Sequence, residues 1–166
     1  AVWHATVVVG LLTGLIAPRL DLVAEVPGVG GLVPMSRLSG ADLMARDVER
    51  IMDELRAETG LEPFVVSQHY GRASQLAFYM RGRPTVYCAS SLIGGGRRTQ
   101  YDMWRETDLR LDHGLAGRPA VVIGGDDEIW TGPFTRVETV GRLEGDRKRG
   151  RDAHKAYGYT GDWPRE

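Results

Sequence analysis

The residues best suited to chemistry lie between positions 93 and 104, in the stretch IGGGRRTQYDMW. A packed core has little use for this run, because glycine buries no side chain and neighbouring arginines resist desolvation. The backbone N–H groups of residues 94–96 can approach a bound oxyanion, and Arg97 and Arg98 carry forked donors suited to phosphate or carboxylate. The stretch therefore predicts an anion-binding loop. A mobile glycine loop with solvent-facing arginines is the alternative interpretation.

Polar and aromatic residues follow the two arginines directly. Gln100 and Asp102 carry groups that hydrogen-bond to hydroxyls, and Tyr101 and Trp104 offer flat rings on which a sugar can stack. The stretch is not a phosphate-binding P-loop, because the Gly-Lys-Ser/Thr ending is missing. We expect a sugar-binding set, with an aromatic anchor packed in the core as the alternative.

Two further polar segments follow expected strands, SQHYGR at 67–72 and GGDDEIW at 124–130. Ligands of open α/β sheets bind beyond the carboxyl ends of the strands, so these segments are expected to converge with the glycine loop. Tyr70 is a candidate hydroxyl contact, whereas His69 is expected to pack or cap. Residues 126–128 are acidic but show no recurring spacing, so we interpret them as a turn and helix N-terminus rather than a metal site.

The cysteine and the basic residues outside this stretch do not predict a second functional site. Cys88 has apolar neighbours in sequence and no nearby basic group, so it is not expected to act as a nucleophile. A single cysteine forms no internal disulfide, and no paired Cys/His spacing indicates zinc, so we predict no metal and no cofactor. The basic run around 147–151 is expected to be a solvated turn, with anionic headgroups as its alternative partner.

The elements that must position these residues predict an α/β fold. A helix is expected from Ser39, as N-cap, to Gly60, and a second at 71–80. Strands are expected at 63–67, 84–90 and 119–125, followed by a strand pair around a charged turn at 144–150. The order predicts a central, mostly parallel sheet with flanking helices.

Bulk composition bounds the partners. The chain has 166 residues, 42% of them hydrophobic, which suits one globular domain with a buried core. Its 21 Lys+Arg against 22 Asp+Glu produce no global basic field, so we predict no nucleic-acid partner. Any electrostatic function must therefore be local.

The first 17 residues contain no Asp, Glu, Lys or Arg. As a helix they would span roughly 25 Å, a little short of a hydrocarbon core of about 30 Å. We therefore predict the end of a transmembrane helix at 1–17, a connector at 18–38 and a soluble domain at 39–166. The alternative is a buried amphipathic helix or strand, since the valines at 7–9 favour β structure and His4 is costly in lipid.

Several segments together carry a family resemblance. The series PFVVSQHYGRASQLAFYMRGRPTVYC, GRRTQYDMW, AVVIGG and PFTRVETVGRL resembles the soluble C-terminal domain of bacterial family 39 glycosyltransferases, over roughly residues 45–160. Its most specific parts are the Tyr-x-x-Ala-Ser-x-Leu-Ala-Phe-Tyr and Gly-Arg-Arg-x-Gln-Tyr-Asp-x-Trp segments. That family comprises polytopic membrane enzymes related to dolichyl-phosphate-mannose protein mannosyltransferases and to the lipid A aminoarabinose transferase.

The resemblance implies transfer of a sugar from a polyprenyl-phosphate donor to an acceptor on the periplasmic or extracellular side of the cell membrane. It places the catalytic acidic residue in a membrane part outside this sequence, so no catalytic residue is carried over. The soluble domain at 39–166 is therefore expected to be an accessory, extracytoplasmic domain. Its partners would be the sugar donor, membrane lipid and the membrane half of the same enzyme. The residues expected to contact substrate are Arg97, Arg98, Gln100, Tyr101, Asp102, Trp104 and Tyr70.

Two other interpretations stay open at this point. One is a freestanding carbohydrate- or phosphate-binding module without catalysis. The other is a small nucleotide- or phosphate-binding enzyme that uses Arg97 and Arg98.

Overall fold

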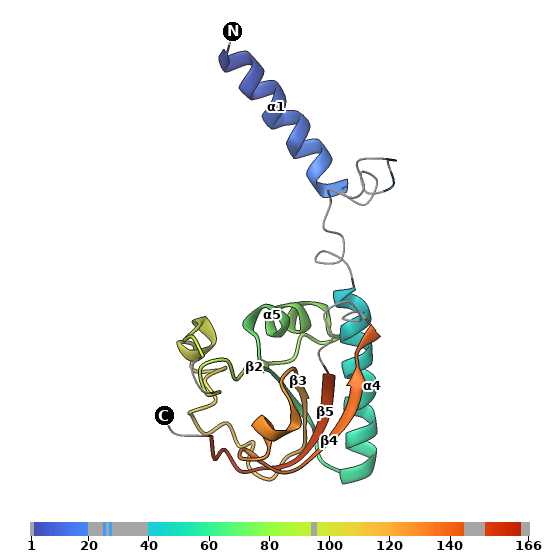
Figure 1. Ribbon diagram of the computed structural model, residues 1–166, viewed down its shortest axis with the longest axis vertical. Helices are drawn as coiled ribbons and strands as arrows, with labels where there is room; N and C mark the ends of the chain where they lie inside the picture. Colours follow the sequence, from blue (N-terminus) through green and yellow to red (C-terminus); the bar gives the residue numbers. More distant parts are fainter. Residues whose placement is uncertain are drawn as a thin grey trace. The chain divides into compact units, whose positions relative to one another are not determined.

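The computed structural model describes residues 2–19, 25, 27, 40–93, 96–144 and 152–163. The chain forms two compact units, Ala1–Ser39 and Gly40–Glu166. Figure 1 draws both along the sequence from blue to red. The second unit contains the sheet and the hydrophobic core, so it is the unit that positions the candidate site.

The first unit contains one α-helix, α1 (Val2–Ile16), followed by a short 3-10 turn, η1 (Ala17–Arg19). The uncharged N-terminal segment is therefore helical, and the strand that its valines allow does not form. None of the residues of α1 is buried, and its apolar side chains are exposed on all sides. Among the described residues, no helix combines the length and apolarity needed to cross a membrane.

The second unit opens with helix α4 (Ala41–Thr59), close to the predicted bounds. One side of the helix is apolar at the 3.6-residue period and is buried; its buried residues are Met44, Ala45, Val48, Ile51, Met52 and Leu55. Gly60 ends the helix in a left-handed conformation, φ 70°, and its N–H donates to the carbonyl of Arg56. The N-cap position is Gly40 and no side chain caps it, while Ser39, the predicted cap, lies outside the described residues.

A five-stranded sheet forms the centre of the second unit, in the order β2-β1-β3-β5-β4. The strands are β1 (Phe64–Ser67), β2 (Val86–Cys88), β3 (Ala120–Ile123), β4 (Phe134–Arg142) and β5 (Asp152–Tyr159). Helix α5 (Tyr70–Tyr79) connects β1 to its parallel neighbour β2. All five strands lie within or next to segments that the sequence predicted.

The prediction of a mostly parallel sheet is wrong in its proportions. β1 pairs in parallel with β2 and with β3, but β5 runs antiparallel to both β3 and β4. β4 and β5 pair antiparallel because only a short connection joins them. β5 also pairs antiparallel with β3, where its residues Ala153 and Ala156 are buried in the core. The sheet is therefore mixed. Its antiparallel half is longer than its parallel half, because β4 and β5 are the two longest strands.

The two helices of this unit, α4 and α5, pack against the same face of the sheet (Figure 1). The sheet residues on that face include Val65, Val86 and Val121. The opposite face is covered by irregular chain, which contributes Leu109 and Leu115, and by a 3-10 turn, which contributes the fully buried Trp130. The expected flanking helices therefore cover one face only.

Candidate functional site

The carboxyl ends of the three parallel strands bring the predicted polar segments to one edge of the sheet. β1, β2 and β3 end at Ser67, Cys88 and Ile123, and because they run in the same direction their following loops leave from the same edge. The segments at 67–72, 90–104 and 124–130 therefore start side by side, as the sequence predicted.

A pocket of about 340 Å³ lies between the start of α5 and the loop that follows β2. Helix α5 contributes Tyr70 and Ser74, which are one helical turn apart. The loop contributes the remaining lining residues, which are Arg97, Arg98, Thr99, Gln100, Tyr101 and Trp104. Six of the seven residues expected to contact substrate line this one pocket, and Asp102 is the exception.

The aromatic walls of the pocket are held from behind. The Tyr101 side chain is buried, and its hydroxyl lies 3.2 Å from the Ser74 hydroxyl on α5. Burial raises the pKa of Tyr101 above its ordinary value, and the Ser74 hydroxyl partly offsets this effect. The Tyr101 and Trp104 rings lie 6.0 Å apart, and Trp104, like Tyr70, keeps about half of its surface exposed. One ring is fixed in the core and two stay accessible.

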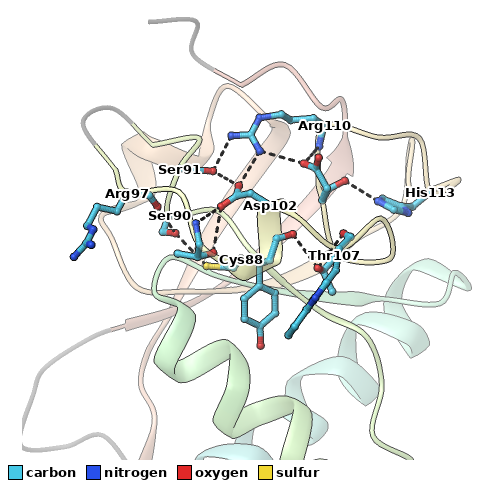
Figure 2. A network of polar contacts seen from close by, with 12 residues as sticks. Cys88, Ser90, Ser91, Arg97, Asp102, Thr107, Arg110 and His113 are labelled. Atoms are coloured by element: carbon cyan, nitrogen blue, oxygen red, sulfur yellow. Dashed lines mark hydrogen bonds and ion pairs between the residues drawn. The ribbon is translucent and has the colours of Figure 1, made fainter.

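Arg97 and Arg98 are the cationic part of the pocket. Both are exposed, and within the described parts of the chain neither guanidinium group forms an ion pair. Most other described arginines are paired, as Arg56 is with Glu62 and Arg110 is with Asp102. In Figure 2 the Arg97 side chain points away from the hydrogen-bonded residues around Asp102. The pocket therefore presents two unpaired positive charges beside exposed rings.

Asp102 is the centre of a hydrogen-bond network beneath the loop (Figure 2). Its carboxylate accepts from the Thr99 backbone N–H at 2.6 Å and from the Thr99 hydroxyl at 3.2 Å, which closes a capping box on the 3-10 turn η3 (Gln100–Asp102). It also accepts from Arg110 at 2.7 Å and from the Ser91 hydroxyl. Because these donors come from three positions along this segment of the chain, Asp102 holds the loop in place.

The charge of Asp102 is stabilised despite its burial. Burial alone would raise the pKa of this carboxyl, but hydrogen bonds from Ser91, Thr99 and Arg110 outweigh it and hold the pKa below its ordinary value. The same ion pair raises the pKa of Arg110. Arg110 also donates to Ser91 at 2.8 Å, which ties the start and the end of the loop together.

Glycine at position 96 is required by a close approach of two backbone segments. A Cβ atom built on Gly96 would lie 1.4 Å from the Ser90 carbonyl oxygen, a distance that no side chain tolerates. The Ser90 hydroxyl donates to the Arg97 carbonyl at 3.3 Å on the other side of this contact. Residues 94 and 95, and with them most of the predicted anion-binding backbone, lie outside the described residues.

The other residues considered from the sequence, His69, Cys88 and the acidic residues at 126–128, have roles in packing, in capping a helix or in forming a turn. His69 is the N-cap of α5, where its Nδ1 accepts from the Gly71 N–H at 3.0 Å. Cys88 is buried, which raises the pKa of its thiol. The acidic residues after β3 start a 3-10 turn, η4 (Asp127–Trp130), and no group of His, Cys, Asp or Glu among the described residues could hold a metal ion.

Sequence reasoning missed four polar residues of this site. Ser74 and Thr99 line the pocket, and Ser91 and Arg110 hold the loop behind it. The Thr-x-x-Asp spacing of Thr99 and Asp102 is a capping-box pattern and could have indicated the turn. Arg110 lies close to Asp108 in the sequence, but nothing local indicates that it also reaches Asp102 and Ser91, which are 8 and 19 residues away.

Comparisons with known proteins add no relative to this description. No protein-family model matches the chain, and neither a curated protein nor a solved structure is significantly similar to it.

Proposed function

We propose that this chain is the accessory, water-exposed domain of an integral membrane glycosyltransferase that moves a sugar from a polyprenyl-phosphate donor to an extracytoplasmic acceptor. One observation carries the proposal: Arg97 and Arg98, which form no ion pair with any described residue, lie in one pocket with the accessible rings of Tyr70 and Trp104. Guanidinium groups bind phosphate and aromatic rings stack on sugars, so the pocket has complementary groups for both parts of a sugar phosphate.

The pocket residues take distinct roles in this proposal. Arg97 and Arg98 bind the phosphate, and Trp104 offers its ring to the sugar. Ser74 and Gln100 are within the same lining and hydrogen-bond to sugar hydroxyls. A volume of about 340 Å³ is near the lower end of ligand-binding clefts and suits a sugar phosphate headgroup, leaving the polyprenyl chain outside.

Bond formation is assigned to the membrane half of the enzyme. None of the described residues that line the pocket is Asp, Glu, His or Cys, the side chains that most often transfer protons or attack as nucleophiles. The nearby carboxylate of Asp102 is already bound by four donors. We therefore expect the chain by itself to bind the donor without transferring its sugar.

Membrane attachment is the second part of the proposal. Helix α1 contains no charged residue and exposes its apolar side chains on all sides, an arrangement that is unfavourable in water. We propose that α1 is the end of a membrane span of a larger enzyme in the cell membrane and that the second unit lies on the periplasmic or extracellular side.

A titration tests the proposed ligand. The chain is solubilised in detergent and titrated with undecaprenyl phosphate, with a nucleotide and with a soluble sugar phosphate. We expect saturable binding of undecaprenyl phosphate, and we expect the Arg97→Ala, Arg98→Ala double variant to weaken it at least about tenfold, because hydrogen bonds to charged groups are worth about 1.5–3 kcal/mol each. Arg105→Ala is the matched control, since Arg105 is exposed on the same segment but does not line the pocket.

Three outcomes would contradict the proposal. Tighter binding of the nucleotide would favour a soluble nucleotide-binding enzyme. Equal affinity for the soluble sugar phosphate would favour a freestanding binding module. Measurable sugar transfer by the isolated chain would show that the bond-making residues lie within this sequence.

A further inference from the structure

The outer face of α5 is unusually aromatic. Ala73 and Leu76 bury the inner side of the helix, whereas Tyr70, Phe78 and Tyr79 point their rings outward. Phe78 is 63% exposed and Tyr79 48% exposed, and their rings meet edge to face with centroids 5.0 Å apart. Tyr70 and Phe78 are eight residues apart, so they are separated by about 12 Å along the helix axis and by about 80° around it, whereas Tyr79 lies about 100° beyond Phe78.

Unpaired arginines lie at both ends of this face. At the Tyr70 end, the pocket brings Arg97 and Arg98 next to the helix. At the other end, the guanidinium carbon of Arg83 lies 5.6 Å from the centre of the Phe78 ring. Within the described ranges none of the three guanidinium groups has a carboxylate partner, in contrast to Arg81, which pairs with Glu49 at 3.3 Å.

The turn after α5 places Arg83 in this position. Gly82 and Arg83 both adopt left-handed backbone conformations, with φ of 73° and 48°. Arg83 is the one described residue other than glycine with a positive φ, a conformation that side chains adopt at an energetic cost. The turn reverses the chain and returns the cation to the aromatic face.

We propose that this face of α5, defined by Phe78, Tyr79 and Arg83 with Tyr70 at its edge, docks on the headgroup layer of an anionic lipid bilayer. Charge complementarity selects this partner, because unpaired cations at both ends of the face require a negatively charged surface. The rings select lipid, because tyrosine and phenylalanine side chains insert at the boundary between headgroups and acyl chains. Arginine suits the same boundary, since its alkyl stem stays in apolar surroundings while its head binds phosphate.

The chain supplies a second, independent reason to expect a bilayer. Helix α1 of the same chain is apolar and uncharged, so the protein has a second element that favours a membrane besides the face of α5. The proposal rests on the proposed function in one respect, that the protein works at a membrane. It adds that the pocket, which Tyr70 also lines, opens beside the docked face, at the level where the phosphate of a lipid-linked sugar lies.

Vesicle sedimentation tests the proposal without α1 and without the donor. The unit Gly40–Glu166 has its own hydrophobic core and is used as the fragment. It is mixed with vesicles of phosphatidylcholine alone or of equal parts phosphatidylcholine and phosphatidylglycerol. We expect binding to the anionic vesicles that weakens as salt is added. The Phe78→Ser, Tyr79→Ser double variant should lower the partition coefficient at least about tenfold, and Arg83→Ser about fivefold.

Matched controls lie elsewhere on the same unit. Leu61 and Val140 are exposed apolar residues outside α5, so the Leu61→Ser, Val140→Ser double variant should bind vesicles like the wild type. Arg142→Ser removes an arginine that has a carboxylate partner, Asp152, and should also be neutral. Near-ultraviolet circular dichroism shows whether each variant keeps its packing.

Four results would overturn the proposal. The first is no binding of the fragment to anionic vesicles, and the second is an equal loss of vesicle binding in the control variants. The third is binding of the fragment to an acidic peptide but not to vesicles. The fourth is vesicle binding that depends on the basic run at 147–151 and is unchanged by replacing Phe78, Tyr79 or Arg83. Because none of these three residues lines the pocket, undecaprenyl phosphate binding by the detergent-solubilised chain should survive their replacement. Failure of docking and failure of donor binding are therefore separate results.

Discussion

Removing the Asp102 carboxylate should both destabilise the domain and disorganise the pocket. Asp102 joins three positions of the chain, Ser91, Thr99 and Arg110, and it sits one residue after a pocket wall, Tyr101. The Asp102→Ala variant leaves the Thr99 N–H without its acceptor and removes the capping box of η3. We expect the segment from Arg97 to Trp104 to lose its fixed shape.

The size of the effect follows from the contacts that are lost. Loss of a capping side chain costs about 0.5–2 kcal/mol, and a buried donor left unsatisfied costs about 1–3 kcal/mol. Arg110 recovers part of the loss, because it remains bound to Asp108 at 3.2 Å and is partly exposed. We expect Asp102→Ala to lower the free energy of unfolding by about 2–3 kcal/mol. Asp102→Asn keeps the shape but loses the charge, and should cost roughly half as much.

Urea unfolding of the Gly40–Glu166 fragment measures this effect. Asp108→Asn is the control, since Asp108 is also bound to Arg110 but accepts no bond from Ser91 or Thr99. The Asp108→Asn change should cost about 0.5 kcal/mol, because asparagine keeps an acceptor for the Arg110 N–H and only a partly exposed ion pair loses its charge. The reasoning is refuted if Asp102→Ala and Asp108→Asn destabilise equally, or if Asp102→Ala binds undecaprenyl phosphate as tightly as the wild type.

Three further predictions concern pH, backbone packing and a second hydrogen-bond network. The folded protein holds the pKa of Asp102 below its ordinary value, so the charged carboxylate should stabilise the fold fully above about pH 4, the pKa of an unfolded aspartate. This contribution is lost as the pH falls through the folded pKa. The difference in unfolding free energy between wild type and Asp102→Asn should therefore shrink below about pH 4. Gly96→Ala should lower stability by about 1–3 kcal/mol in urea unfolding and abolish ligand binding, because the added Cβ would collide with the Ser90 carbonyl. Burial and the hydrogen bond to Glu58 raise the pKa of Tyr157 to about 12. The neutral phenol therefore stabilises the fold fully below about pH 10, and this contribution is lost as the pH rises through about 12. The Tyr157→Phe variant should remove the last tyrosinate step from an ultraviolet titration.

Local patterns in the sequence were sufficient to predict the elements of the second unit. Helix α4 has a strong apolar period and a closing glycine, and β1 and β3 are short apolar runs that follow prolines. Each of these signals lies within the element that it predicts. The element order was therefore predictable, and so was the edge of the sheet at which the polar segments meet.

The pairing of the strands was not predictable at the same level. Nothing local shows that β5, the last strand, pairs with β3 as well as with β4. That contact is set by burial of β5, whose residues Ala153 and Ala156 lie in the core on opposite faces of the sheet. Tertiary packing decides it, which is why the mostly parallel sheet was overestimated.

The sequence predicted most of the residues that line the pocket, but not that Asp102 holds the loop in place behind it. Arg97, Arg98 and Trp104 lie in the segment that follows β2, and the structure places them in one pocket with Tyr70. Asp102 was grouped with them because it is a neighbour in sequence. Its burial depends on Arg110, a residue that reaches it only in the folded chain.

Photo-crosslinking in native membranes tests the central claim most directly. Met103 is exposed beside the pocket without lining it, so a benzophenone side chain placed there samples the ligand and leaves the pocket intact. We predict a crosslinked adduct that contains polyprenyl phosphate by mass spectrometry and that is lost in the Arg97→Ala, Arg98→Ala variant. Adducts with water-soluble nucleotides or sugars alone, or a polyprenyl adduct that persists in the double variant, would contradict the account.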